Sequence, residues 1–254
     1  QTSKRRMAGV CNEKKGMKRF FVDKTDKPIT VLKGEERRHL ADVLRARVGD
    51  TVILCPNDGK DYIYRITSFT KNSVTLEYVS EENNPTETDL KLSVFCALLK
   101  GDKTEFAVQK LTELGVKKII PFISDYTVQR SEKNDRLLRA AHEASKQCGR
   151  AIVPEVCRIV SFSEMTEMLS GYDSVVFAYE GAYADGLRIE DAVKPTDNSV
   201  ALIVGPEGGF SEKEVDVLRS LGHMPVTLGK RILRAETASV AAAAVIMYIC
   251  GEWK

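Results

Sequence analysis

The sequence predicts a two-domain α/β protein in which a small β-barrel precedes a larger domain built on a parallel sheet. A chain of 254 residues is long for a single core. Residues 17–80 have the pattern of short strands, whereas apolar strands alternate with helices over residues 90–254. Residues 81–89 are acidic and proline-bearing and contain no apolar side chain, so we interpret them as the linker.

The predicted first domain contains four short strands and one helix. β-branched and aromatic residues cluster between turn signals such as residues 57–59. The helix places Leu40, Val43 and Leu44 on one face. We expect the strands to close into a barrel, because a barrel leaves few exposed strand edges. The strands are expected at residues 29–32, 50–55, 62–67 and 73–79, and the helix at residues 35–45.

In the second domain, almost continuously apolar strands alternate with helices, which indicates a parallel sheet covered on both faces. We expect strands at residues 92–99, 116–123, 174–179, 200–204 and 225–228. We expect helices at residues 103–114 and 132–147, and two more that begin at Glu212 and near Thr237.

Composition excludes several classes of protein. Hydrophobic residues make up 43% of the chain and charged residues 29%, which is typical of a globular protein and not of a disordered one. The longest apolar stretch, residues 240–250, is too short to span a bilayer. The six cysteines form no CxxC pair and no signal peptide is evident, so we expect a cytoplasmic protein. The three histidines lack ligand spacing, so we expect no metal site.

The formal net charge of +2 depends on the first residues of the chain. Residues 1–16 contain five basic residues against one acidic residue, and the remainder is slightly acidic. Because this segment has no apolar periodicity and Met17 reads as a fresh start, we expect residues 1–16 to be a disordered extension. The overall charge therefore does not indicate a protein that binds polyanions in general. Any nucleic-acid site has to be a local basic patch.

The loop after the fourth strand of the second domain is the strongest signal for a ligand site. Ligands bind at the carboxyl ends of strands in open α/β sheets, and adjacent glycines allow close backbone approach. The carboxylate of Glu207 would repel a phosphate, so we expect a positively charged ligand such as S-adenosylmethionine. Ser211 and Glu214 predict a capping box that begins the next helix. A simple tight turn is the alternative. The loop reads Gly205-Pro206-Glu207-Gly208-Gly209-Phe210.

A second motif places three cations directly before a helix of small residues. Cations at a helix N-terminus oppose the helix dipole, so a bound phosphate or nucleotide would compensate them. An ordinary helix of high propensity is the alternative. The motif reads Leu228-Gly229-Lys230-Arg231-Ile232-Leu233-Arg234-Ala235-Glu236-Thr237-Ala238.

Together the two motifs resemble the SPOUT methyltransferases, and within them the RsmE-type family that methylates N3 of a uridine in small-subunit ribosomal RNA. Three further stretches agree with this family, namely residues 19–22, 112–116 and 143–150. The resemblance extends from Met17 to the end of the chain and leaves only residues 1–16 outside.

The resemblance implies a deep trefoil knot, with the segment from Pro225 onward threaded through a loop. It also implies a homodimer, a first domain similar to PUA-type RNA-binding domains, and S-adenosylmethionine as the cofactor. The cofactor pocket would be formed by Ala178, Tyr179, Glu180, Gly205, Pro206, Glu207, Gly208, Gly209, Leu228, Gly229, Ile232 and Leu233.

Catalysis on uracil N3 requires an anion on the base, and Arg234 is our candidate for stabilising it. Glu236 is the candidate proton acceptor, or else a cap of the following helix. Alternatively, Arg234 binds a backbone phosphate. The candidate RNA-binding residues, which a solvated surface would explain equally well, are Arg19, Arg37, Arg38, Arg45 and Arg150.

Two other functions remain open at this point. The chain could be a SPOUT methyltransferase that acts on a ribose 2′-hydroxyl or on a transfer-RNA base. It could also be a non-catalytic RNA-binding or assembly factor, which the intact glycine loop and Arg234 disfavour. A dehydrogenase is disfavoured because the dinucleotide fingerprint is absent.

Overall fold

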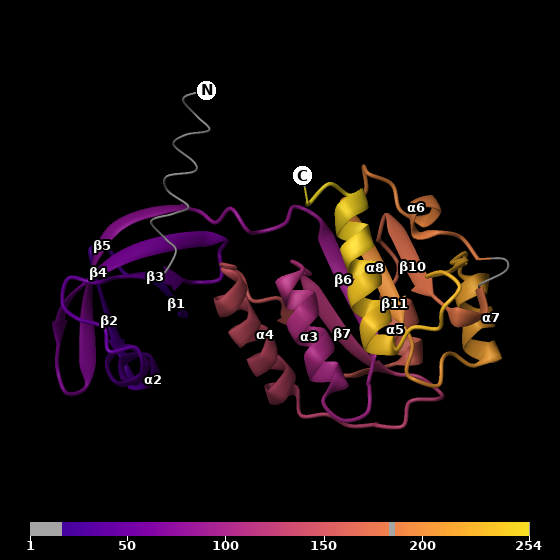
Figure 1. The fold of residues 1–254 in the computed structure, drawn as a ribbon, viewed down its shortest axis with the longest axis horizontal. Helices are drawn as coiled ribbons and strands as arrows, with labels where there is room; N and C mark the ends of the chain where they lie inside the picture. The colour runs from indigo at the N-terminus through magenta and orange to yellow at the C-terminus, as the bar shows by residue number, and fades with distance from the viewer. Residues whose placement is uncertain (1–16, 183–185, 254) are drawn as a thin grey trace. The chain divides into compact units, whose positions relative to one another are not determined.

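The computed structural model describes residues 17–182 and 186–253, and the predicted extension at residues 1–16 lies outside them. The chain divides into two compact units, which Figure 1 shows in indigo to magenta and in magenta to yellow. The first unit extends to Glu87 and also includes Gly149–Ile152, and the second contains the rest. No helix in the described part of the chain is long and apolar enough to cross a membrane.

The first unit is the predicted β-rich domain, built on a five-stranded sheet with the strand order β1-β3-β4-β5-β2. β1 runs parallel to β3, and the other neighbours are antiparallel. The sheet curls around a core that includes Phe20, Leu54, Tyr64 and Leu76 (Figure 1). Its strands are β1 (Lys18–Phe21), β2 (Ile29–Lys33), β3 (Thr51–Cys55), β4 (Lys60–Phe69) and β5 (Ser73–Asn83).

The predicted helix at residues 35–45 is shorter than expected and changes its winding. The α-helix α2 (Gly34–Arg38) continues as a π-helix, η1 (His39–Val43). Leu40 is fully buried as predicted, but Val43 is 67% exposed. The wider π turn shifts the side-chain period, so the expected apolar face is not continuous.

The predicted linker at residues 81–89 is wrong over its first half. β5 continues to Asn83, and the Glu81 carboxylate forms ion pairs with Lys27 and, at 3.4 Å, with Lys60. Asn84 is buried, and its side-chain amide donates to the carboxylate of Asp61 at 2.8 Å. Polar composition was misread as a linker because these side chains are paired across the sheet.

A short segment from the middle of the sequence completes the first unit. The Glu87 carboxylate accepts hydrogen bonds from the backbone N–H groups of Ala151 at 3.0 Å and Ile152 at 2.9 Å. It also forms an ion pair with Arg150 Nη2 at 3.2 Å. Ala151 is fully buried in a small cluster with Ile53 and other residues. The chain therefore leaves the first unit after Glu87 and returns to it at residue 149.

The second unit contains the predicted parallel sheet, with the strand order β12-β10-β11-β6-β7-β8 and with β9 paired to β7. All strand pairs in it are parallel. Its strands are β6 (Lys91–Ala97), β7 (Lys118–Ile123), β8 (Glu155–Val156), β9 (Val160–Ser161), β10 (Ser174–Ala178), β11 (Ser199–Val204) and β12 (Pro225–Val226).

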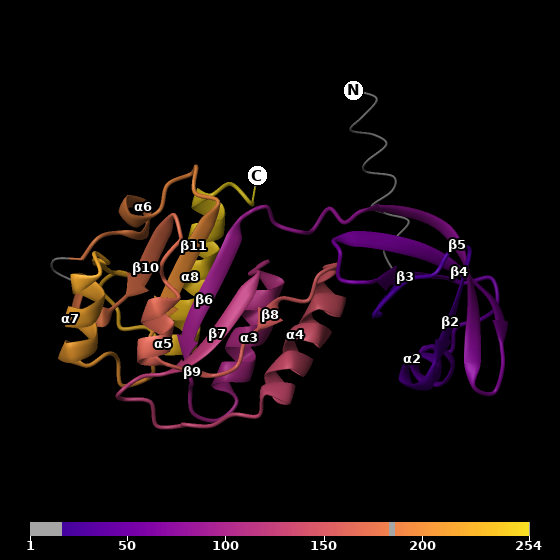
Figure 2. The same cartoon turned by 180° about the vertical axis from the view of Figure 1, so that it is seen from behind.

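Helices cover both faces of this sheet, as predicted (Figures 1 and 2). One face packs against α3 (Lys103–Glu113), α4 (Asn134–Cys148) and α8 (Ala235–Ile249). The other packs against α5 (Phe162–Glu167) and α7 (Glu212–Ser220). Two short elements, η2 (Glu180–Ala182) and α6 (Ile189–Ala192), follow β10.

β12 lies between two segments that come earlier in the chain. Val226 pairs with Ala178 of β10 on one side and forms a bridge with Leu187 on the other. The predicted trefoil knot in this region stays a prediction.

Candidate functional site

A cavity of about 590 Å³ opens at the carboxyl ends of β10, β11 and β12. Three loops form most of its wall, and they are the loops that the sequence singled out. All the predicted cofactor-binding residues except Gly208 line the cavity, and Arg234 lines it as well. Glu236 is not among the lining residues.

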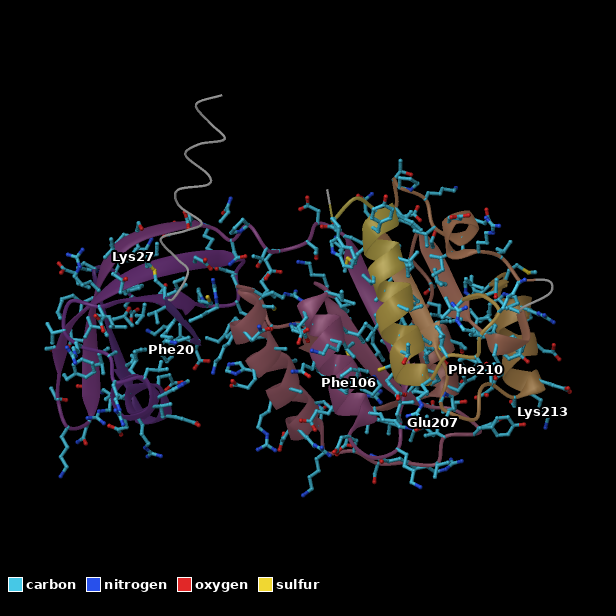
Figure 3. The ribbon with its side chains drawn as sticks, viewed as in Figure 1. Phe20, Lys27, Phe106, Glu207, Phe210 and Lys213 are labelled. Carbon is cyan, nitrogen blue, oxygen red and sulfur yellow. The ribbon has the colours of Figure 1, made fainter. Side chains whose placement is uncertain are left out.

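The glycine loop after β11 is shaped by contacts that exclude larger residues. A Cβ atom on Gly205 would lie 2.8 Å from the ring of Phe210, which is buried and packs against Phe177 at a centroid distance of 5.1 Å. Gly209 has a φ of +73°, and a Cβ atom there would collide with the carboxylate of Glu180. Figure 3 shows Phe210 and Glu207 near one end of α8.

The Glu207 carboxylate is already neutralised by the protein, which differs from the prediction that it would select a cationic ligand. It accepts hydrogen bonds from the backbone N–H of Lys100 at 3.1 Å and from Lys103 Nζ at 2.9 Å. Burial alone would raise the pKa of Glu207, but the hydrogen bond from Lys103 and the backbone donors lower it below its usual value. Lys103, which also lines the cavity, was not predicted as a site residue.

Glu180 is the carboxylate that stays available in the cavity. Its side chain is exposed and lies against Gly209, and it forms no ion pair or hydrogen bond with the residues that the structure describes. Among the described residues that line the cavity, it is therefore the carboxylate that can meet a positively charged ligand.

The predicted capping box at the start of α7 is confirmed and does more than begin the helix. The Ser211 side chain accepts from the Glu214 backbone N–H, and the Glu214 carboxylate accepts from the Ser211 N–H at 2.9 Å. The same buried carboxylate accepts from Ser124 Oγ at 3.0 Å and from the backbone N–H of Asp125 at 3.0 Å. It therefore joins the loop after β7 to the end of the glycine loop.

The second motif forms the remaining wall of the cavity. Gly229 has a φ of +99°, which favours glycine, and Ile232 is 86% exposed. Arg234 is the N-cap residue of α8, but its side chain makes no capping hydrogen bond and no ion pair with a described residue. Arg234 is exposed, and no described residue competes with an anion for its guanidinium.

Glu236 does not cap α8. No side-chain hydrogen bond caps the helix, and Glu236 Oε2 is buried without a hydrogen-bond partner in the described chain. The capping alternative for Glu236 is therefore unsupported, and its catalytic role stays a prediction.

The candidate RNA-binding arginines lie in different environments. Arg19 is almost buried and its Nη2 donates to Asp61 Oδ2 at 3.0 Å, and Arg150 is buried against Glu87. Arg37 donates to the Asp42 carboxylate at 3.4 Å. Arg38 and Arg45 are exposed and form no ion pair with a described residue. Burial of Arg19 and Arg150 argues against direct contact with RNA.

Comparisons with known proteins agree with this arrangement. Residues 86–247 match the family described as RNA methyltransferase domain. The chain belongs to this RNA methyltransferase family. Residues 32–78 of this RNA methyltransferase match the RNA methyltransferase PUA domain. Ribosomal RNA small subunit methyltransferase E of Bacillus subtilis is 33% identical over 91% of this chain and 96% of its own length.

Solved structures of similar proteins extend the comparison. The small subunit methyltransferase E of Neisseria gonorrhoeae, bound to S-adenosylmethionine, is 29% identical with a TM-score of 0.86, covering 94% of this chain and 100% of its own. A methyltransferase of Legionella pneumophila in complex with the same cofactor is 28% identical with a TM-score of 0.82, covering 91% of this chain and 97% of its own.

The described residues of this RNA methyltransferase contain no group of three or more histidine, cysteine, aspartate or glutamate side chains that could hold a metal ion.

Proposed function

We propose that this RNA methyltransferase transfers a methyl group from S-adenosylmethionine to N3 of a uridine in small-subunit ribosomal RNA. The observation that carries the proposal is the cavity at the carboxyl edge of the parallel sheet, where the Glu180 carboxylate and the Arg234 guanidinium, neither paired with a described residue, border the same space. The names of the relatives from Bacillus subtilis and Neisseria gonorrhoeae support the small-subunit substrate.

The cavity suits this cofactor in size and chemistry. Its volume lies in the range of small-molecule sites, and glycine backbone at residues 205, 209 and 229 forms part of the wall. Apolar side chains of Leu228 and Leu233 border the space in which the adenine would lie. The Glu180 carboxylate offers a hydrogen-bond acceptor for the ammonium group and a negative charge for the sulfonium group. When bound, the cofactor supplies an electrophilic methyl group.

Arg234 is the residue that we assign to the chemistry on the base. Uracil N3 carries a proton and attacks well only when the base becomes an anion. A permanently charged, planar guanidinium beside the cavity stabilises negative charge on the carbonyl oxygens that flank N3. Removal of one preorganised donor of this kind typically costs about 10²–10³ in rate. Glu236 does not line the cavity, so we propose that solvent water accepts the N3 proton, and S-adenosylhomocysteine is the leaving group.

Contact with RNA outside the cavity is assigned to Arg38 and Arg45 in the first unit, because both guanidiniums are exposed and unpaired among the described residues. We further infer that the chain acts as a homodimer in the cytoplasm. The exposed apolar side chains of Ile232 (86%), Val245 (43%) and Tyr248 (69%), in or beside α8, support an interface there.

Methylation of small ribosomal subunits from cells that lack this protein tests the proposal. The subunits would be incubated with the protein and labelled S-adenosylmethionine, and the released nucleosides would be analysed by mass spectrometry. We expect 3-methyluridine. A 2′-O-methylated nucleoside would favour the ribose-directed alternative, and bound cofactor without any transfer to RNA would favour a non-catalytic assembly factor.

A further inference from the structure

We propose that Tyr126 is a positioning residue whose ring forms a stacking platform for a base of the substrate RNA beside the cofactor cavity. The inference rests on the proposed function, because it assumes that RNA approaches this edge of the sheet. Tyr126 follows β7 and is 52% exposed. Among the described residues, the Tyr126 side chain makes no hydrogen bond, aromatic-ring pair or cation–π contact.

The position of Tyr126 is fixed against the glycine loop. A Cβ atom built on Gly208 would lie 2.9 Å from the Cβ atom of Tyr126. Gly208 is flanked by Glu207 and Gly209, which both line the cavity. Glycine at position 208 therefore permits the close approach of Tyr126 to the loop that forms one wall of the cavity, although neither Gly208 nor Tyr126 is itself a lining residue.

The residues on either side of Tyr126 are held rigidly. Asp125 donates its backbone N–H to the buried Glu214 carboxylate at 3.0 Å, and its own carboxylate accepts from Ser211 Oγ at 2.7 Å. Thr127 is buried, and its hydroxyl accepts from the Ser124 backbone N–H at 2.9 Å. An exposed aromatic ring on an immobilised backbone loses little conformational entropy when it contacts a ligand.

Two exposed cations, one in the same loop and one in the loop after β6, favour RNA as the partner of this surface. Arg130 is exposed, and its Nη2 donates to the backbone carbonyl of Asp125 at 3.4 Å. Lys100 is also exposed, and its backbone N–H donates to Glu207 in the neighbouring loop. Cations interspersed with an exposed aromatic ring are the usual means by which proteins bind an unpaired nucleotide. A base that leaves its helix to be modified needs such a partner.

The variants Tyr126→Ala, Tyr126→Phe and Val128→Ala test this role. The free energy of stacking one base on an aromatic side chain corresponds to a change in affinity of about 5- to 150-fold. We expect Tyr126→Ala to lower kcat/KM for small subunits within that range while its affinity for S-adenosylmethionine is unchanged. Tyr126→Phe keeps the ring and should stay within about twofold of wild type. Val128 is 75% exposed in the same loop, and Val128→Ala controls for general disturbance of the loop.

The outcomes separate this inference from the proposed function. If the wild-type protein methylates no RNA, the proposed function fails first. If the wild type is active and Tyr126→Ala matches it, the stacking role is overturned. Equal losses in Tyr126→Phe and Tyr126→Ala, or in Val128→Ala and Tyr126→Ala, would also overturn it, because the ring would then not be the feature that matters.

Discussion

The Lys103 ammonium lies 2.9 Å from the Glu207 carboxylate, and this ion pair joins the first turn of α3 to the glycine loop after β11. Both side chains are about one-third exposed. An ion pair with this exposure contributes at most about 1 kcal/mol to stability. Its value to the site is geometric, because it holds one wall of the cavity to a helix of the core.

This pair predicts a pH-dependent stability difference between wild type and Glu207→Gln. The pKa of Glu207 is lowered in the folded chain, so the pair stabilises the protein above the usual glutamate value of about 4.3. That stabilisation is lost as the pH falls through the lowered pKa. The wild type should therefore have a higher Tm than Glu207→Gln at pH 7, and this difference in Tm should become smaller below about pH 4. Calorimetry at a series of pH values measures the two Tm values. Glu77→Gln is the control, because Glu77 is exposed and forms no ion pair with a described residue.

Gly209→Ala should weaken cofactor binding more than it destabilises the fold. A Cβ atom at a φ of +73° costs roughly 1–2 kcal/mol, and here it also collides with Glu180. We expect affinity for S-adenosylmethionine to fall by more than about tenfold, since each factor of ten corresponds to about 1.4 kcal/mol. Gly222→Ala is the matched control, because Gly222 has a φ of +86° with no atom near its Cβ position. Similar binding by both variants in calorimetric titration would contradict the assigned role of Glu180.

Arg234→Ala should lower turnover at saturating RNA by about 10²–10³ while affinity for S-adenosylmethionine changes little. Arg234→Lys should recover only part of the rate, since lysine keeps the charge but loses the planar fork. Single-turnover methylation of small subunits measures the rate. Arg219→Ala, which removes an exposed arginine at the end of α7, serves as the control. Unchanged turnover in Arg234→Ala would leave this residue with a binding role only.

Arg150→Met should destabilise the protein without altering how RNA binding depends on salt. The change removes the guanidinium that pairs with the Glu87 carboxylate, which is 11% exposed, and the loss of one member of a buried ion pair costs about 3–5 kcal/mol. Urea unfolding measures the stability. In contrast, the Arg38→Ala, Arg45→Ala double variant should reduce the salt dependence of RNA binding and leave stability nearly unchanged. A reduced salt dependence in Arg150→Met would restore Arg150 as an RNA contact.

Local patterns made much of this fold predictable from the sequence. Apolar runs identified the strands of the parallel sheet, and the Ser211–Glu214 spacing identified the capping box at the start of α7. The glycine loop was found because its residues are adjacent in the chain. These features depend on neighbouring residues, and neighbouring residues are what a single sequence displays.

Most of the features that were missed depend on residues far apart in the chain. Lys103 and Glu207 are distant in sequence, so nothing indicated that the Glu207 charge was already neutralised. The identity of an arginine in the sequence does not show whether it is exposed, like Arg38, or buried against a carboxylate, like Arg150. The π turn at residues 39–43 changed the helical period without any glycine or proline to signal it.

The return of Gly149–Ile152 to the first unit has a consequence for synthesis of the protein. Translation proceeds from the N-terminus, and domains usually fold in that order as they emerge from the ribosome. Here the backbone N–H groups of Ala151 and Ile152, which bind the Glu87 carboxylate, are made only after β6, α3, β7 and α4. The N-terminal unit is therefore completed late, and a ribosome that stalls within α4 leaves it unfinished.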